Sequence, residues 1–285
     1  MTDAAPHPAR PRRARNQHVL TVLRTERLTA HLVRVHLGGE GFGAFLADAD
    51  PGRLAATDRY VKLLLAPRGS TLEPPFDLDA LRSSVPAEQL PVRRTYTVRS
   101  LDHEEQSAAI DFVVHGDEGV AGPWALAARP GDRVALSAPG GAWSPRVEAA
   151  HLLLGDDSAL PAIASALEAM PEQARGLALI EVHGAEDELV LAAPDGVEVR
   201  WLHRGGLEAG HALVAAVRAE PRPEGELEVF AHGERTAMKQ LRALLQDEWG
   251  VERRALSLSA YWALGRAEDR FQAEKREPVG AIFAD

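Results

Sequence analysis

The pattern of apolar residues changes near Pro145, and this change constrains the fold more than any other feature of the 285-residue chain. Before Pro145, short runs of alternating apolar and polar residues are separated by Gly and Pro; in one of them Val33 and Val35 alternate with Arg34. The pattern predicts six strands, at residues 19–23, 32–37, 60–65, 94–98, 110–114 and 134–136. Short strands at this spacing are typical of a small antiparallel barrel, and residues 68–90 are expected to form a long excursion between two of them.

Strand and helix patterns alternate after Pro145. A continuous apolar run at 151–154 predicts a buried strand, and Leu160, Ile163 and Leu167 predict the helix that follows. Further strands are expected at 177–182, 197–202, 227–231 and 255–261, and helices at 213–217, 234–249 and 267–275. Such alternation indicates a parallel sheet flanked by helices.

The two patterns define the expected fold as β + α/β. An N-terminal antiparallel six-stranded β-barrel over residues 16–145 is followed by a Rossmann-like open α/β domain over 146–285, which ends in a C-terminal helix. Residues 1–15, rich in Arg and Pro, are expected to form a disordered tail.

The composition excludes several classes of function. A net charge of −10 argues against general nucleic-acid binding. The absence of cysteine excludes disulfides, thiolate nucleophiles and cysteine-bound iron–sulfur clusters. The eleven histidines show no short ligand spacing, so we expect no metal site. No apolar run approaches the roughly 20 residues that cross a bilayer and no secretory signal is evident. We therefore expect a cytoplasmic protein without membrane insertion.

One predicted strand concentrates polar chemistry in seven residues, Arg93-Arg94-Thr95-Tyr96-Thr97-Val98-Arg99. Because side chains alternate across a strand, Arg94 and Tyr96 share one face, and Thr95, Thr97 and Arg99 share the other. A tyrosine ring can stack on a flat ring, and an arginine can bind phosphate oxygens bidentately. The strand can therefore hold a flat, doubly phosphorylated cofactor, although the same residues also fit a surface ladder with solvated arginines.

A second stretch lies just downstream. Val114, His115 and Gly116 end one predicted strand, and a loop with Gly122, Pro123 and Trp124 follows. Glycines allow the backbone to approach a phosphate closely, and successive N–H groups can form an anion nest. His115 can stack on a cofactor ring, or it can be a hydrogen-bonded histidine at the end of a strand.

Three further stretches lie in the second half. The first, Gly155-Asp156-Asp157-Ser158-Ala159-Leu160-Pro161-Ala162-Ile163, follows the first strand of the predicted sheet, at an edge where open α/β sheets bind ligands. Asp157 or Ser158 can equally be a helix N-cap. The second is a Gly-Glu turn at 233–234 before a helix, and the third contains Tyr261 and Trp262 near the C-terminus.

Together the five stretches resemble the siderophore-interacting protein family of ferredoxin-reductase-like flavoenzymes. Arg94-Thr95-Tyr96-Thr97 is similar to the family's Arg-x-Tyr-Thr flavin signature, and residues 155–163 are similar to its Gly-Asp-Glu-Thr-Ala-Leu-Pro-Ala-Ile. Residues 111–124 resemble its Asp-x-x-Phe-Val-x-His-Gly run with the Gly-Pro that follows. In such flavoenzymes the barrel holds the flavin and the α/β domain presents the nicotinamide.

The resemblance implies an NAD(P)H-dependent reductase of ferric siderophores with FAD as cofactor. Hydride would pass from NADPH or NADH to FAD, and single electrons would then reach chelated Fe(III), which is released as Fe(II). No side chain is implied as a catalytic acid, base or nucleophile. The implied cofactor-binding residues are Arg94, Thr95, Tyr96, Thr97, Arg99, Val114, His115, Gly116, Gly122, Pro123, Trp124, Asp156, Asp157, Ser158 and Ala159. The implied substrate residues are Lys62, Tyr261, Trp262 and Arg266.

Two departures from the family pattern affect these expectations. Trp124 follows Pro123 directly, where relatives place further residues including a serine, and Ala263 stands where many relatives carry an arginine. Fewer cations suit a less charged substrate, such as a hydroxamate chelate, unless Arg59 or Arg266 replaces the missing charge. The alternatives are a general FAD-linked NAD(P)H or ferredoxin oxidoreductase and a non-catalytic siderophore- or flavin-binding protein. We expect a monomer; the siderophore class and the electron donor stay open.

Overall fold

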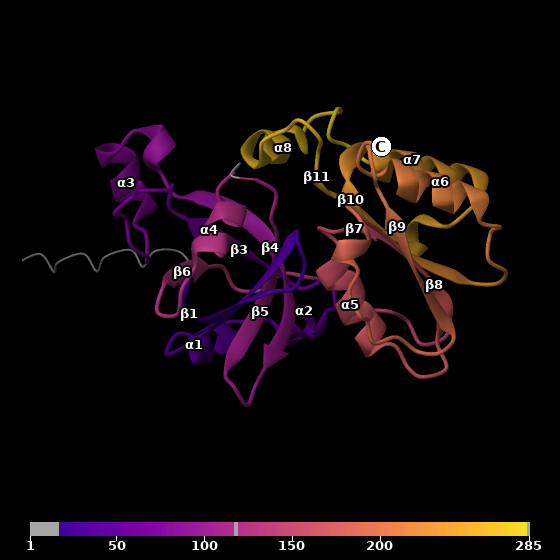
Figure 1. Cartoon of the computed structure of the whole chain (residues 1–285), viewed down its shortest axis with the longest axis horizontal. Helices are drawn as coiled ribbons and strands as arrows, with labels where there is room; N and C mark the ends of the chain where they lie inside the picture. Colours follow the sequence, from indigo (N-terminus) through magenta and orange to yellow (C-terminus); the bar gives the residue numbers. More distant parts are fainter. Residues whose placement is uncertain (1–16, 117–118, 284–285) are drawn as a thin grey trace, which may run out of the picture.

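The computed structural model describes residues 17–116 and 119–283, and within them it shows two domains side by side (Figure 1). The expected tail at 1–15 lies outside the described residues. No helix in the described part of the chain is long and apolar enough to cross a membrane.

The N-terminal domain is a closed antiparallel barrel, as the sequence predicted. Its strands follow the order β1-β2-β5-β4-β3-β6 around the barrel. They are β1 (His18–Arg27), β2 (Leu32–Gly38), β3 (Tyr60–Leu65), β4 (Val92–Asp102), β5 (Ser107–Val113) and β6 (Arg133–Leu136). Val33 and Val35, the apolar members of one alternating run, point into the barrel core and are at most 4% exposed. The period-two pattern therefore identified the inner face correctly.

Four short helices accompany the barrel: α1 (Phe42–Ala47), α2 (Pro51–Ala55), α3 (Leu78–Ser84) and α4 (Ala121–Ala127). Helix α3 lies in the excursion expected at 68–90, followed by a 3₁₀ turn at Ala87–Gln89. Helix α4 corrects the expectation of a Gly-Pro loop, because Gly122, Pro123 and Trp124 lie inside it. Pro123 is tolerated there because the first turn of a helix does not use its N–H groups, and Ala125 packs on the barrel core.

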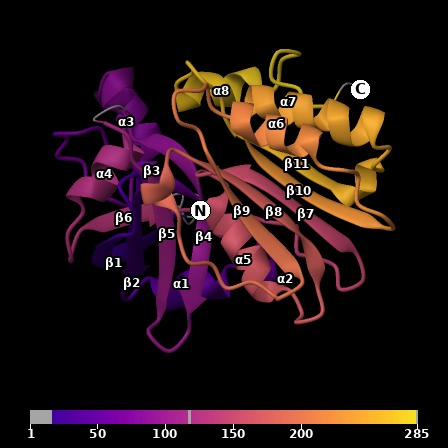
Figure 2. The ribbon, with the colours of Figure 1, turned by 45° about the vertical axis from the view of Figure 1, so that its right-hand side comes forward.

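The C-terminal domain is a parallel five-stranded sheet in the order β11-β10-β7-β8-β9. The strands are β7 (Ala150–Asp156), β8 (Arg175–Val182), β9 (Val197–His203), β10 (Leu227–Glu234) and β11 (Leu256–Trp262). The helices are α5 (Leu160–Ala169), α6 (His211–Ala219), α7 (Arg235–Arg242) and α8 (Glu268–Glu274). The helix expected at 234–249 changes at residue 243 into a π-helical segment, Ala243–Glu248. Figure 2 shows α6 and α7 on one face of the sheet and α5 on the other, toward the barrel.

Helix α5 joins the two domains. It packs against β7 of its own sheet and against β4 of the barrel. Leu32 of the barrel belongs to the same apolar cluster as Ile163 of α5 and Leu153 of β7. The barrel strand with the Arg-x-Tyr-Thr residues is thus held against the α/β domain.

Candidate functional site

Strand β4 presents its polar residues at the boundary between the domains. It runs between β3 and β5, with Lys62 directly opposite Thr95 and Tyr60 opposite Thr97. Lys62 and Thr95 are exposed, whereas Thr97 is only 7% exposed. Along the outer face of β4, the side chains are therefore exposed at Thr95 and buried at Thr97, toward the α/β domain.

Tyr96 anchors an aromatic group on the barrel. Its ring centroid lies 4.4 Å from that of Phe112, which in turn lies 5.5 Å from that of Trp124 in α4. Burial raises the pKa of Tyr96, and the negative charge of Glu268 raises it further. The phenol therefore stays protonated and can donate a hydrogen bond at neutral pH. The aromatic packing brings the first turn of α4 to β4.

Arg94 holds a carboxylate in a forked geometry. Its two terminal nitrogens donate to the two oxygens of Asp269 in α8, over 3.0 and 3.2 Å. The Arg94 side chain is 13% exposed and that of Asp269 is 69% exposed. Because phosphate accepts the same bidentate pattern, the Arg94 fork is suited to binding a phosphate group.

Arg99 does not lie on the face of β4 that strand alternation predicted for it. The pairing of β4 with β5 shifts register between Val98 and Ser100, and Arg99 sits at this bulge. Its guanidinium pairs with both carboxylate oxygens of Glu168 in α5, and its backbone carbonyl accepts a hydrogen bond from Ser165 Oγ at 2.8 Å. Arg99 therefore links β4 to α5 rather than continuing the face formed by Thr95 and Thr97.

Asp156 fixes the strand-to-helix junction at the end of β7. Among the described residues its carboxylate accepts four hydrogen bonds, from Ser158 N, Ser158 Oγ, Glu234 N and Trp262 Nε1. Asp156 is 1% exposed. It ties the carboxyl ends of β7, β10 and β11 together, so in this structure the predicted cofactor residue Asp156 and the predicted substrate residue Trp262 bind each other.

Asp157 faces the ion pair between Arg204 and the buried Glu181. Oδ2 of Asp157 lies 3.7 Å from Nη2 of Arg204, and Nε of Arg204 donates to Glu181 Oε1 at 3.0 Å. Glu181 also accepts hydrogen bonds from the N–H groups of Gly210 and Leu213 at the start of α6. Burial, and secondarily the charge of Asp156, raise the pKa of Asp157 to about 7. This carboxyl therefore changes charge in the physiological range.

The raised pKa of Asp157 predicts a pH dependence of stability. Its carboxyl holds a proton in the folded state up to about pH 7, but in the unfolded chain it loses the proton near the ordinary aspartate pKa of 3.8. Stability is therefore expected to fall as pH rises between these values, by roughly 4 kcal/mol at most. Asp157→Asn should flatten this slope, as measured by urea unfolding from pH 5 to 8. An unchanged slope in the variant would contradict the assignment.

Tyr261 lies where the α/β domain meets β4. Burial and the charge of Asp58 raise the pKa of Tyr261, while the nearby Thr97 hydroxyl acts in the opposite direction. Residues 97 and 261, which the sequence singled out separately, thus meet at the domain boundary. A hydroxyl pair of this kind can orient the polar edge of a bound ring.

His232, which the sequence did not assign to the site, packs beneath Tyr261. Its ring stacks on Phe230 at 4.0 Å and meets the Tyr261 ring edge-on at 4.8 Å. Burial lowers the pKa of His232 to about 3, so the imidazole is neutral at physiological pH. With Asp58, His232 lines a cavity of about 330 Å³ that opens between the domains. Its only sequence signal was its place beside the turn at 233–234.

Two of the predicted cations, Arg266 and Arg59, are bonded to other groups of the protein. Arg266 Nε donates to Glu274, which also pairs with Arg235 and Arg270 and whose pKa falls to about 2 because of these arginines. Arg59 donates to backbone carbonyls of α2. Lys62 lies close enough to Lys275 for its charge to lower the pKa of Lys275, after the larger effect of burial.

The other predicted residues differ in exposure. Val114 is buried, His115 and Gly116 are exposed after the end of β5, and Ala159 is buried at the start of α5.

The fold and the site define a class, namely two-domain chains of the ferredoxin-reductase-like type whose barrel presents an Arg-x-Tyr-Thr strand to an open α/β domain. Two family models match in this order. The Siderophore-interacting FAD-binding domain covers residues 21–143, and the Siderophore-interacting protein model covers residues 148–265. The chain belongs to the siderophore-interacting protein family, and its barrel is the FAD-binding domain of that family.

Relatives and solved structures agree with this membership. The chain is 43% identical over 275 residues to an uncharacterized protein of Mycobacterium tuberculosis, covering 91% of this chain and 95% of that protein. It is 36% identical over 200 residues to the ferric vibriobactin reductase ViuB of Vibrio cholerae, covering 69% of this chain and 73% of ViuB. The crystal structure of the siderophore-interacting protein SipS from Aeromonas hydrophila aligns with a TM-score of 0.76 at 28% identity, covering 93% of this chain and 99% of SipS. The predicted family and fold class are confirmed.

Proposed function

We propose that this protein is an FAD-dependent reductase of ferric siderophores that takes electrons from NADPH or NADH. One observation carries the proposal: β4, which bears the Arg-x-Tyr-Thr residues, packs against α5, which begins within the family stretch at 155–163, so two family stretches that are far apart in the sequence meet at the domain boundary. The name of the relative ViuB, a ferric vibriobactin reductase, supports the same class of reaction.

The donors around β4 fit FAD. Arg94 already binds a carboxylate through two parallel N–H groups, as it would bind a phosphate. Thr95 adds an exposed hydroxyl on the opposite face of β4, and Tyr96 offers a protonated phenol and an aromatic ring. When bound, FAD supplies the exchange between a two-electron donor and a one-electron acceptor. The chain's own residues bind and orient it, and the packing of α5 on β4 shields one side from water.

The charges near the site favour a substrate with little negative charge. Arg94 and Arg266 are both paired with carboxylates, Asp269 and Glu274. Lys62, with Lys275 nearby, is the cation that we assign to the chelate, because it is exposed on the outer face next to Thr95. A hydroxamate-type chelate suits two lysines better than a polyanionic catecholate does.

Removing the charge of Lys62 is expected to weaken binding of the ferric chelate without affecting FAD. Lys62→Ala should raise KM for an anionic ferric chelate by about fivefold, as expected for a contact of roughly 1 kcal/mol, and the effect should shrink at high salt. Steady-state reduction assays at two ionic strengths measure this. Lys239→Ala is the matched control, because Lys239 of α7 binds the carbonyl of Val279. Equal KM values for both variants would show that Lys62 does not contact the substrate.

An anaerobic flavin titration tests the proposed function as a whole. The purified protein should be yellow, NADPH or NADH should bleach it, and ferric hydroxamate should restore the colour. Failure of every ferric chelate with recovery by oxidised ferredoxin would favour a general FAD-linked oxidoreductase. A flavin that neither nicotinamide bleaches would favour reduced ferredoxin as donor or a non-catalytic binding protein. The cytoplasmic location and the monomeric state stay predictions.

A further inference from the structure

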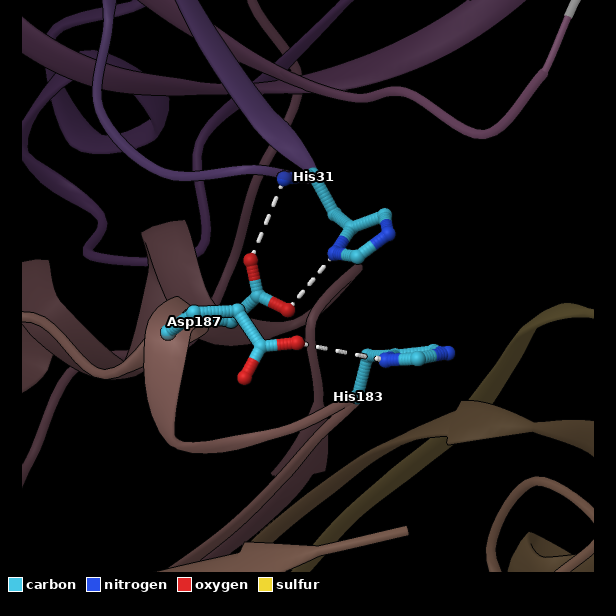
Figure 3. Close-up of side chains that lie close together, drawn as sticks. His31, His183 and Asp187 are labelled. Carbon is cyan, nitrogen blue, oxygen red and sulfur yellow. Dashed lines mark hydrogen bonds and ion pairs between the residues drawn. The ribbon is translucent and has the colours of Figure 1, made fainter. Parts of the chain in front are cut away.

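Four side chains that can bind a metal converge from both domains. His31 lies in the turn between β1 and β2 of the barrel, while His183, Glu186 and Asp187 follow β8 of the α/β domain. One ligand atom of each lies within 4.8 Å of those of the other three. Figure 3 shows the rings of His31 and His183 on the same side of Asp187. No local sequence pattern indicates this group, because His31 is separated from Asp187 by 156 positions.

Asp187 is the buried anchor of the group. Its Oδ1 accepts a hydrogen bond from the backbone N–H of His31 at 3.1 Å, and its Oδ2 lies 2.7 Å from His31 Nδ1. The Asp187 side chain is 5% exposed, whereas that of His31 is 30% exposed. A preformed contact between the domains therefore fixes one carboxylate and one imidazole.

His183 and Glu186 complete the group on the solvent side. Nδ1 of His183 lies 3.7 Å from Glu186 Oε1, and both side chains are more than half exposed. The 3₁₀ turn Ala185–Asp187, closed by Asp187 N–H to the Gly184 carbonyl at 3.0 Å, turns residues 183, 186 and 187 toward His31.

The two imidazoles distinguish this group from an ordinary ion pair. The His31–Asp187 contact alone would explain those two residues, but it does not require a second histidine. The ring centroids of His31 and His183 lie 4.6 Å apart at an interplanar angle of 33°. Two imidazoles beside two carboxylates form the ligand set that zinc and iron(II) accept, whereas magnesium and calcium prefer oxygen ligands alone.

We propose that His31, His183, Glu186 and Asp187 bind one divalent transition-metal ion, which joins the barrel to the α/β domain. The buried Asp187 positions the site, and the exposed side chains of His183 and Glu186 leave a path for the ion. The site involves none of the residues assigned to FAD or to the ferric chelate, so it is independent of the proposed reductase activity.

Cobalt(II) is the probe for this site, because its visible absorption reports the ligands around it. Titration of the untagged full-length protein should give a saturable band at one ion per chain, abolished by Zn²⁺ and unaffected by excess Mg²⁺. His31→Gln and His183→Gln should each raise the dissociation constant at least tenfold, the lower end of what even outer-shell changes cost. Zn²⁺ should also raise the melting temperature of the wild type and have less effect on either variant.

His203→Gln is the matched control, because His203 is also an exposed histidine paired with a glutamate, Glu188, at 2.7 Å. It should bind Co²⁺ as the wild type does. The proposal is overturned if no saturable binding occurs up to millimolar Co²⁺, if Mg²⁺ displaces Co²⁺, or if His31→Gln and His183→Gln bind as tightly as His203→Gln. Because binding is read directly, a modest loss of stability in either variant does not obscure the result.

Discussion

Replacing Asp156 with alanine is expected to lower the free energy of unfolding by roughly 3–5 kcal/mol, because it leaves buried donors without their acceptor. The donors are Ser158 N and Oγ, Glu234 N and Trp262 Nε1, all bonded to a carboxylate that is 1% exposed. Water cannot readily replace that acceptor at this depth. Urea unfolding followed by tryptophan fluorescence measures the loss.

Two variants bracket the effect of Asp156→Ala. Ser158→Ala removes one of the four donors and should cost about 1 kcal/mol. Asp195→Ala changes an exposed aspartate in the turn before β9 and should stay within about 0.5 kcal/mol of the wild type. If Asp156→Ala behaved like Asp195→Ala, the junction of β7, β10 and β11 would not depend on this carboxylate.

Replacing Arg94 with alanine is expected to raise the dissociation constant for FAD about 100-fold. A bidentate, charge-assisted contact with a phosphate contributes up to roughly 3 kcal/mol, and 1.4 kcal/mol corresponds to a factor of ten. Quenching of FAD fluorescence on titration into the flavin-free protein measures the change. If the variant bound FAD as tightly as the wild type, Arg94 would not be the residue that binds the phosphate.

The neighbours of Arg94 provide the controls. Arg93→Ala changes the adjacent exposed arginine and should leave the affinity for FAD within about threefold. Asp269→Ala removes the carboxylate that holds Arg94 in this structure. Since a largely exposed ion pair is worth at most about 1 kcal/mol, Asp269→Ala should tighten FAD binding by no more than about fivefold.

The sequence predicted the strands well because their side chains alternate against a buried core. The runs around Val33 and in β4 have the period of two that a half-buried strand imposes, and the structure has strands at each of them. Helices α1 and α2 were not predicted, since five or six residues are too few to show a helical period. The loop expected at Gly122–Trp124 was wrong for a related reason: α4 is seven residues long and begins with residues typical of turns.

The candidate site was predictable in part. The stretch with Asp156 and the stretch with Trp262 were both singled out, but their hydrogen bond joins residues 106 positions apart, and no local pattern records it. The direction of Arg99 depends on a one-residue shift in strand pairing, which alternation alone does not reveal. The group around His31 and Asp187 is invisible in the sequence for the same reason as the Asp156 bond, since its members come together only when both domains are folded.

Helix α5 makes the two domains of this protein depend on each other. Its Ile163 shares one apolar cluster with Leu32 of the barrel, while Ser165 and Glu168 bind the backbone and the side chain of Arg99. Either half produced alone would expose an apolar face and lose polar partners supplied by the other. The two domains are therefore not interchangeable modules: a chimera with a foreign barrel must also carry over the surface that meets α5, and the two halves are expected to melt as one cooperative unit.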